Sequence, residues 1–406
     1  MCVSTDTEYR ERLFCKEAIK AATLECRHRS SMIGGSTGRW DGWPQRVMVS
    51  AGPRRNAIAP HARHMPLVLA AIVALWATLA LTVGVATSAA AVTQPGQPTS
   101  GPGGSDYAHG GWRVHAGGRG SDAFYVFEPT APRPARAPLA IVMHGYGEFA
   151  GYDQMRALIR HTVRKGNVVI YPRWQTLADP CLGPFDVESC MTAGLHGIRG
   201  GLEYLRGGGR VKPVLGETSY FGFSFGGIIT ANLANRSTSL QLPEPRAIFL
   251  DDPHDGGLAG AGEPALDDSL AGIPSSVLVH CHSGAEGVIA EVGKQDSSCN
   301  ALFPKLGHIP NANKDLVLTH ADSHGTPALS SKHGVCAGPN AGAAAVDAYD
   351  WNFCWKVFDA LQQCAYRQAF CRDALGDTPE HRNLGRWSDG TPITQLKIQD
   401  AAPIAP

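Results

Sequence analysis

The sequence is poor in charged side chains and carries no net charge. Charged residues make up 18% of the 406 positions, below the ~25% that is usual in globular proteins, and 36 Lys and Arg balance 36 Asp and Glu. The chain has no long run of Lys or Arg, so we do not expect it to bind nucleic acid. It also lacks a P-loop, C-x2-C pairs and an H-E-x-x-H segment. A nucleotide or NAD cofactor and a cysteine-based metal site are therefore not expected.

The charges that are present are distributed unevenly. Residues 1–91 hold 11 basic and 6 acidic side chains, whereas the other 315 residues hold 25 basic and 30 acidic ones. No charged residue occurs from 65 to 92, an apolar segment that follows several Arg and His residues and contains three consecutive alanines near its end. This arrangement predicts a secretory signal peptide over 65–91, and hence an extracellular or periplasmic protein. Because the apolar segment is long, an uncleaved anchor is the alternative, and only then is a membrane an expected partner.

Residues 1–64 lack clear helical or strand periodicity, and we interpret them as an over-extended reading frame with translation starting at Met48 or Met65. Three of the eleven cysteines lie in this part, which leaves eight in the body. An even number of cysteines in an exported protein favours a disulfide framework. Pairing between near neighbours would give the bonds 181–190, 281–299, 336–354 and 364–371.

The body of the chain alternates between short apolar runs and longer amphipathic stretches. Before it, residues 92–110 are rich in Gly, Pro and Ser, which predicts a flexible linker. Strands are expected at 124–127, 139–143, 168–171, 219–222, 247–250, 276–280 and 316–319, and helices at 154–163, 193–205, 228–234 and 345–363. This alternation predicts one α/β domain over 111–400, with a mostly parallel central sheet flanked by helices.

The most informative motif is Gly222-Phe223-Ser224-Phe225-Gly226-Gly227, which lies between an expected strand and an expected helix. It matches G-x-S-x-G, in which the serine occupies a sharp strand-to-helix turn and the glycines avoid collisions with neighbouring backbone. The helix N-terminus behind Ser224 would favour negative charge that develops beside it. Such a serine becomes a nucleophile once an adjacent base removes its proton.

A second motif, His144-Gly145-Tyr146-Gly147, follows the expected strand 139–143. Together the two motifs resemble those of the α/β-hydrolases, in particular secreted lipases, esterases and polyesterases, over roughly residues 112–400. The resemblance implies an α/β-hydrolase fold in which the backbone N–H groups of Tyr146 and Phe225 form an oxyanion hole. It also implies a catalytic triad in the order serine, acid, histidine. His144 itself is interpreted as structural.

The triad order of this family places the catalytic base after Ser224. His324 follows the expected strand 316–319, at the last strand-to-loop junction before the C-terminal helix, and we predict that it is the base. The alternatives are His320, which we place still on the strand, and His333, further along the same loop.

Two positions are open for the acid of the triad. Asp252 follows the expected strand 247–250, in a segment that resembles the L-D-P segment of pancreatic-type lipases and the D-P-x-D-G segment of chlorophyllases. Glu286 follows the expected strand 276–280, where most bacterial esterases and cutinases have Asp. We predict that Asp252 is the acid, with Glu286 as the alternative. The further candidates are Asp251, Asp255 and Asp322.

These residues predict a serine carboxylester hydrolase that forms an acyl-enzyme and needs no metal or organic cofactor. The substrate would be a small-molecule, lipid or polyester ester, and the protein is expected to be a monomer. An acyltransferase with the same triad and a non-catalytic binding protein of the same fold are the alternative functions. His280 and His282 would point to one face of a strand, as zinc ligands can, but no third ligand occurs at a useful spacing.

Overall fold

The computed structural model describes residues 91–179, 187–254, 266–287, 298–338 and 346–405. Residues 1–90, which contain almost all of the predicted leader, lie outside this part of the chain. The candidate acid Asp255 lies outside it as well.

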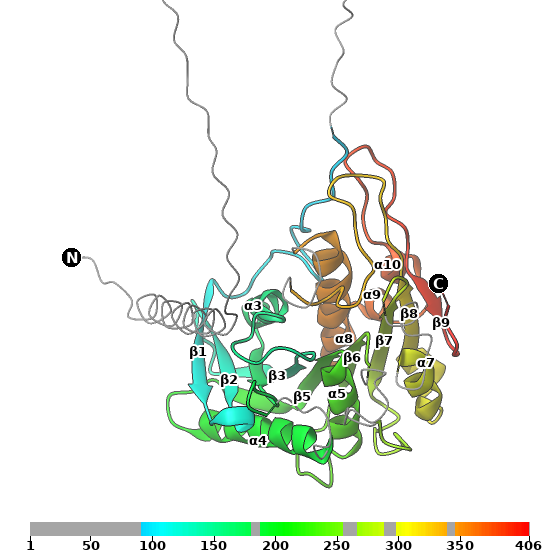
Figure 1. The fold of residues 1–406 in the computed structure, drawn as a ribbon. Helices are drawn as coiled ribbons and strands as arrows, with labels where there is room; N and C mark the ends of the chain where they lie inside the picture. Colours follow the sequence, from blue (N-terminus) through cyan, green and yellow to red (C-terminus); the bar gives the residue numbers. More distant parts are fainter. Residues whose placement is uncertain (1–90, 180–186, 255–265, 288–297, 339–345, 406) are drawn as a thin grey trace, which may run out of the picture. The chain divides into compact units, whose positions relative to one another are not determined.

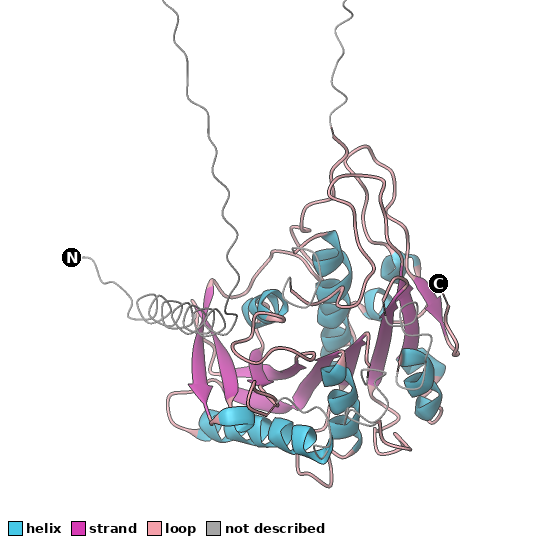
Figure 2. Ribbon diagram, viewed as in Figure 1, coloured by secondary structure: helices cyan, strands magenta, loops and turns pink. Residues whose placement is uncertain are grey.

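A nine-stranded sheet runs through the described residues in the order β1-β2-β4-β3-β5-β6-β7-β8-β9 (Figures 1 and 2). The six strands from β3 to β8 are parallel to one another. At one edge β1 and β2 pair antiparallel, and at the other edge β9 pairs antiparallel with β8. The predicted α/β class, with a mostly parallel sheet and flanking helices, is confirmed.

The elements have the following bounds. The strands are β1 (Gly111–Gly117), β2 (Phe124–Thr130), β3 (Arg136–Met143), β4 (Val168–Pro172), β5 (Lys212–Phe223), β6 (Ala247–Asp251), β7 (Leu278–Gly284), β8 (Lys314–Thr319) and β9 (Lys397–Gln399). The α-helices are α3 (Arg156–Arg164), α4 (Val187–Arg206), α5 (Phe225–Asn235), α7 (Cys299–Leu302), α8 (Trp355–Arg367), α9 (Cys371–Ala374) and α10 (Pro379–Arg382). A π-helix, Asp350–Cys354, leads directly into α8, and short 3-10 helices occupy Gly120–Asp122, Phe303–Leu306 and Asn311–Asn313.

Apolar side chains alternate between the two faces of the sheet. On β3, Leu139 and Ile141 join one hydrophobic core, whereas Ala140 and Val142 join the other, because successive residues of a strand point to opposite faces. Side chains of α4, α5 and α7 belong to the first core, and side chains of α3 and α8 belong to the second. Burial on both faces explains why the central parallel strands are continuous apolar runs in the sequence.

Three of the four predicted disulfides are present, namely Cys281–Cys299, Cys336–Cys354 and Cys364–Cys371. Cys190 is disulfide-bonded as well, but its predicted partner Cys181 lies outside the described residues. Such bonds persist in oxidising compartments, which fits a protein outside the cytoplasm. Within the described residues, no helix combines the length and the apolar character needed to cross a bilayer.

The segment 92–110, expected to be a flexible linker, contains no helix or strand but is bonded to the body of the protein. The N–H of Gly103 donates to Oδ2 of Asp359 on α8 (2.9 Å). The carbonyl of Gly101 accepts a hydrogen bond from Nζ of Lys165, the residue after α3 (2.8 Å). Parts of the segment therefore lie against α8 and against the residue that follows α3.

Candidate active site

Ser224 lies on the turn between β5, which ends at Phe223, and α5, which begins at Phe225. Its backbone has φ 55° and ψ −125°, a region that residues other than glycine rarely adopt and that costs about 1–3 kcal/mol. The N–H of Ser224 donates to the carbonyl of Asp251, at the end of the neighbouring strand β6 (3.0 Å). The turn thus holds the serine at the carboxyl edge of the sheet, where open α/β sheets bind their ligands.

Three glycines around this turn occupy positions where a side chain would collide with its neighbours. A Cβ on Gly226 would overlap the carbonyl oxygen of His144, so α5 begins directly against the loop that follows β3. A Cβ on Gly227 would lie 2.8 Å from Cβ of Pro253, and one on Gly222 would lie 2.5 Å from the carbonyl oxygen of Gly226. The glycines of the motif therefore permit the close approach of three chain segments.

His333 links Ser224 to Asp252 through hydrogen bonds of both ring nitrogens. Its Nε2 lies 2.9 Å from Oγ of Ser224, and its Nδ1 lies 2.9 Å from Oδ2 of Asp252. The side chain of Asp252 is only 1% exposed, whereas that of His333 is 27% exposed. With the Nδ1–H group donating to the buried carboxylate, Nε2 is left to accept the proton of the serine hydroxyl.

Asp252 is held in place by its surroundings as well as by the histidine. It follows β6 with φ 46°, in the left-handed region that Asp tolerates better than most residues. Its N–H donates to the carbonyl of His282 on β7 (2.8 Å). A Cβ on Gly287 would lie 2.5 Å from Oδ2 of Asp252, so this glycine leaves room for the carboxylate.

Among the described residues, the histidine bonded to the serine is His333 and not the predicted His324. Nε2 of His324 lies 2.7 Å from Oδ2 of Asp389, and both side chains are exposed, at 39% and 38%. After β8 the chain turns back through an antiparallel bridge between Asp322 and Leu329. This turn carries His333, the alternative further along the loop, to the serine.

The remaining candidates for the triad make contacts of other kinds. Oδ1 of Asp251 lies 2.8 Å from Nδ1 of His282, and both side chains are fully buried. Glu286 is exposed, and its Oε2 accepts a hydrogen bond from the N–H of Ser331 at 3.4 Å. Asp322 accepts hydrogen bonds from the N–H and hydroxyl of a threonine in the C-terminal segment. The residue that follows β8, His320, accepts a hydrogen bond on its carbonyl from a tyrosine hydroxyl.

The loop after β3 lies against the serine. A Cβ on Gly145 would lie 3.0 Å from that of the serine. The N–H of Gly145 donates to Oε1 of Gln154 (2.9 Å), and the N–H of Gly147 donates to Oε1 of Gln175 (2.8 Å). Between them, the N–H of Tyr146 has no acceptor within the described residues.

The first residue of α5, Phe225, provides a second N–H group without an acceptor in the described part of the chain, as is usual for the first turn of a helix. The side chains of the same two residues pack together, with ring centroids of Tyr146 and Phe225 5.3 Å apart. Phe149 packs edge-on against Tyr146 at 5.6 Å. Two N–H groups and an aromatic cluster therefore lie in the segments that adjoin the serine.

His144 is bonded to this loop through its side chain. It is fully buried, and its ring nitrogens lie 2.8 Å from the carbonyl oxygen of Gly145 and 3.0 Å from that of Arg173. The ring stacks on Trp174, with centroids 4.8 Å apart. Burial lowers the pKa of His144 to about 4, so the imidazole is neutral near pH 7.

Among the described residues, one cluster of side chains has the composition of a metal site. Asp251, His282 and Cys336 bring potential ligand atoms within 4.8 Å of one another. The sulfur of Cys336 is already in a disulfide, however, and the ring nitrogens of His282 are bonded to Asp251 and to the hydroxyl of Thr319 (2.9 Å). Nε2 of His280, two residues earlier on β7, faces a histidine ring from α10 at 3.3 Å. The donors in this cluster are therefore engaged with the protein itself.

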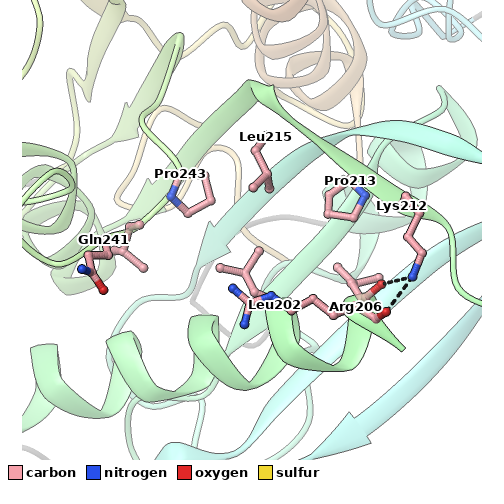
Figure 3. A pocket seen from close by; sticks show the side chains of 9 residues that line it. Leu202, Arg206, Lys212, Pro213, Leu215, Gln241 and Pro243 are labelled. Atoms are coloured by element: carbon pink, nitrogen blue, oxygen red, sulfur yellow. Dashed lines mark hydrogen bonds between the residues drawn. The ribbon is translucent and has the colours of Figure 1, made fainter. Parts of the chain in front are cut away.

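A pocket of about 330 Å³ lies beside the start of β5 (Figure 3). The serine follows the other end of this strand. The pocket is lined by side chains of α4, such as Leu202, and of the start of β5, including Lys212 and Leu215. Nζ of Lys212 is occupied by the carbonyls of Leu205 and Arg206 at the end of α4 (3.0 and 2.8 Å). Because ligands of open α/β sheets bind beyond the carboxyl ends of the strands, this pocket is not part of the candidate site.

No protein-family model matches the chain, and no curated protein matches it either.

Proposed function

We propose that the protein is a secreted serine hydrolase of the α/β-hydrolase kind, which cleaves carboxylic esters by means of Ser224, His333 and Asp252. The observation that carries the proposal is the continuous chain of hydrogen bonds from the buried carboxylate through the imidazole to Oγ of a serine on a strained turn. The three residues follow the order serine, acid, histidine, which is the order used by α/β-hydrolases. The disulfides support an oxidising compartment, in agreement with the signal peptide predicted over 65–91.

In the first half of the reaction, Nε2 of His333 removes the proton of Ser224 as Oγ attacks the carbonyl carbon of the ester. The 2.9 Å separation is within the range of general-base catalysis. Asp252 accepts the Nδ1–H bond, which fixes the tautomer of the imidazole and stabilises the imidazolium that forms. The carbonyl oxygen becomes negatively charged, and the N–H groups of Tyr146 and Phe225 donate hydrogen bonds to it.

The tetrahedral intermediate then collapses to an acyl-enzyme. The imidazolium of His333 gives its proton to the oxygen of the leaving alcohol, and the acyl group remains on Ser224. A water molecule attacks the acyl carbon and transfers its proton to the same Nε2. Collapse of the second tetrahedral intermediate releases the carboxylic acid and restores the serine hydroxyl. The reaction requires no cofactor for its proton balance.

The proposal is tested by covalent labelling together with ester hydrolysis. We expect a fluorophosphonate probe to label the peptide that contains Ser224, and p-nitrophenyl acetate, butyrate, octanoate or palmitate to be hydrolysed. Ser224→Ala should lose both the label and the hydrolysis. Ser237→Ala is a control, because Ser237 is also buried and lies just after α5, and it should retain both.

The same experiment separates the alternative functions. Labelling with efficient transfer of the acyl group to an added alcohol, in preference to water, would indicate an acyltransferase. Absence of both labelling and hydrolysis from the folded protein would indicate a non-catalytic binding protein and would contradict the proposal. The relative rates across acyl chain lengths would distinguish an esterase of short chains from a lipase.

A further inference from the structure

The two proposed oxyanion donors are held in place by different means. Phe225 lies at the start of α5, where the hydrogen bonds of the helix fix the direction of its N–H group. Tyr146 lies in the loop between the end of β3 and the start of α3, and no helix or strand includes it. The direction of its N–H group therefore depends on side chains that bond to this loop.

One side-chain amide bonds to the backbone on both sides of the Tyr146 N–H group. Oε1 of Gln154 accepts a hydrogen bond from the N–H of Gly145 (2.9 Å), and Nε2 of Gln154 donates to the carbonyl of Tyr146 (3.1 Å). The first contact restrains the peptide plane before the donor peptide, and the second restrains the plane after it. The two bonds therefore fix the ends of the donor peptide, at Cα of Gly145 and Cα of Tyr146. The carbonyl oxygen of this peptide lies 2.8 Å from Nδ1 of His144, which restrains its rotation.

The contacts also require the amide of a glutamine. The N–H of Gly145 needs an acceptor and the carbonyl of Tyr146 needs a donor, so only one orientation of the Gln154 amide satisfies both. A carboxylate could accept from Gly145 but would face the Tyr146 carbonyl with a second oxygen. Gln154 is 3% exposed, so water has little access to replace a lost bond.

Gln154 is itself bonded to the two segments beside it. Its N–H donates to Oε2 of Glu148 (2.6 Å), in the same loop as Tyr146. Its carbonyl accepts a hydrogen bond from the N–H of Gly338 (2.5 Å), five residues after His333. The residue therefore joins the loop that carries the proposed oxyanion donor to the segment that carries the proposed base.

We propose that Gln154 is a positioning residue, which aims the N–H group of Tyr146 at the developing oxyanion and fixes this loop relative to the segment of His333. The inference rests on the function proposed above. It assigns Gln154 no contact with the substrate, so its loss should lower turnover while substrate affinity changes little.

Gln362 provides a matched control for substitutions of Gln154. It is equally buried at 3% exposure, and its amide also makes two hydrogen bonds, from Nε2 to the hydroxyl of Ser219 (2.8 Å) and to Oε1 from Asn167 (3.2 Å). It lies on α8, and within the described part of the chain its amide makes no bond to the loop after β3. Gln154→Met and Gln362→Met therefore each remove two buried hydrogen bonds. Only the bonds lost in Gln154→Met support the loop that carries the proposed oxyanion donor.

The first experiment compares kcat and KM of these two variants on p-nitrophenyl butyrate. Removing an oxyanion donor outright costs about 10² to 10³ in turnover, so displacing one should cost about 10-fold to 10²-fold. We expect Gln154→Met to lower kcat by this factor with KM within about 3-fold of the wild type. Gln362→Met should lose stability in urea to a similar extent but keep its kcat. Equal kcat in the two variants would overturn the inference.

The second experiment uses Gln154→Glu, whose side chain has the same size. When the introduced carboxyl is protonated, it can accept from Gly145 and donate to the carbonyl of Tyr146 as the glutamine does. The ratio of variant to wild-type kcat should therefore rise as the pH falls through the pKa of this carboxyl. A ratio that does not change with pH would contradict the inference, even if Gln154→Met failed to fold.

The outcomes distinguish this inference from the proposed function. A wild-type protein that is not labelled at Ser224 and does not hydrolyse esters would contradict both. A wild-type protein that is labelled and active, with Gln154→Met as active as Gln362→Met, would contradict only the role of Gln154.

Discussion

The imidazole of His333 lies 2.9 Å from Oγ of Ser224, although the two residues are 109 positions apart in the sequence. The contact forms because the loop after β8 folds back and is bonded to the end of β7. The N–H of Glu286 donates to the carbonyl of Ser331 (2.9 Å), and the N–H of Ala285 donates to its hydroxyl (3.0 Å). Ser331, which lies two residues before His333, thus anchors the segment that carries the proposed base.

The assignment of Asp252, and not Glu286, as the acid of the proposed triad is tested by replacing each carboxylate with its amide. Asp252→Asn should lower kcat by about 10⁴, because the amide cannot hold the imidazole in the tautomer that accepts the serine proton. Glu286→Gln should change kcat by less than about 3-fold, since its side chain is exposed and bonds only weakly to a backbone N–H. Steady-state hydrolysis of p-nitrophenyl butyrate measures both. A larger loss in Glu286→Gln than in Asp252→Asn would show that the acid lies after β7.

The glycines of the turn lead to a prediction about stability. Gly226→Ala should lower the free energy of unfolding by about 3 kcal/mol, because its Cβ would overlap the backbone carbonyl of His144. Gly216→Ala, in the exposed part of β5 with open space around it, should change the value by less than about 0.5 kcal/mol. Urea denaturation followed by circular dichroism measures the difference. Equal stability of the two variants would mean that the turn does not pack as tightly as the structure shows.

The disulfide Cys336–Cys354 should support activity as well as stability. It joins the segment just after His333 to the π-helix that leads into α8, and it closes a separation of 18 residues. Replacing both cysteines by alanine should cost about 3 kcal/mol of stability. It should also lower kcat, because the segment that carries His333 loses a covalent anchor. Replacing the pair Cys364–Cys371 should cost about 2.5 kcal/mol without lowering kcat. Unchanged kcat in the first double variant would contradict this role.

The buried carboxyl of Glu148 leads to a prediction about pH. Burial is the largest cause that raises its pKa, from 4.5 to about 7, so between these values the folded state holds a proton that the unfolded state releases. The contribution of the protonated Glu148 to the free energy of unfolding is complete below pH 4.5 and is lost as the pH rises through about 7. The free energy of unfolding of the wild type minus that of Glu148→Gln should therefore fall between pH 4.5 and 7. Urea titrations across this range measure the difference, and a constant or rising value would contradict the prediction.

The sequence predicted the central strands well because they are buried on both faces. The runs 139–143 and 168–171 fall within β3 and β4, where almost every position is apolar. The strand β1 was not predicted, since its burial alternates and it interleaves arginine and histidine with apolar residues at the sheet edge. The expected helix 345–363 is replaced in part by the π-helix Asp350–Cys354, whose wider winding leaves no simple mark in the spacing of apolar residues.

The site was predictable where its determinants are local. The turn around Ser224 is specified by glycines within three positions, and Asp252 follows directly from the end of a buried strand. The sequence favoured His324 over His333, the histidine that the structure brings to Ser224, because the path of the chain between β8 and the site cannot be obtained from local patterns. The bridge at Asp322–Leu329 shifts the contact from His324 to His333, and such tertiary bonds leave no short motif in the sequence. Gln154 was missed for the same reason.

The most direct test compares His333→Ala with His324→Ala on p-nitrophenyl butyrate. If His333 is the base, His333→Ala should lower kcat by at least about 10³-fold, because the serine hydroxyl then lacks a proton acceptor. His324→Ala should keep kcat within about 3-fold of the wild type, since its imidazole bonds to the exposed Asp389. Full activity of His333→Ala together with an inactive but folded His324→Ala would contradict the account.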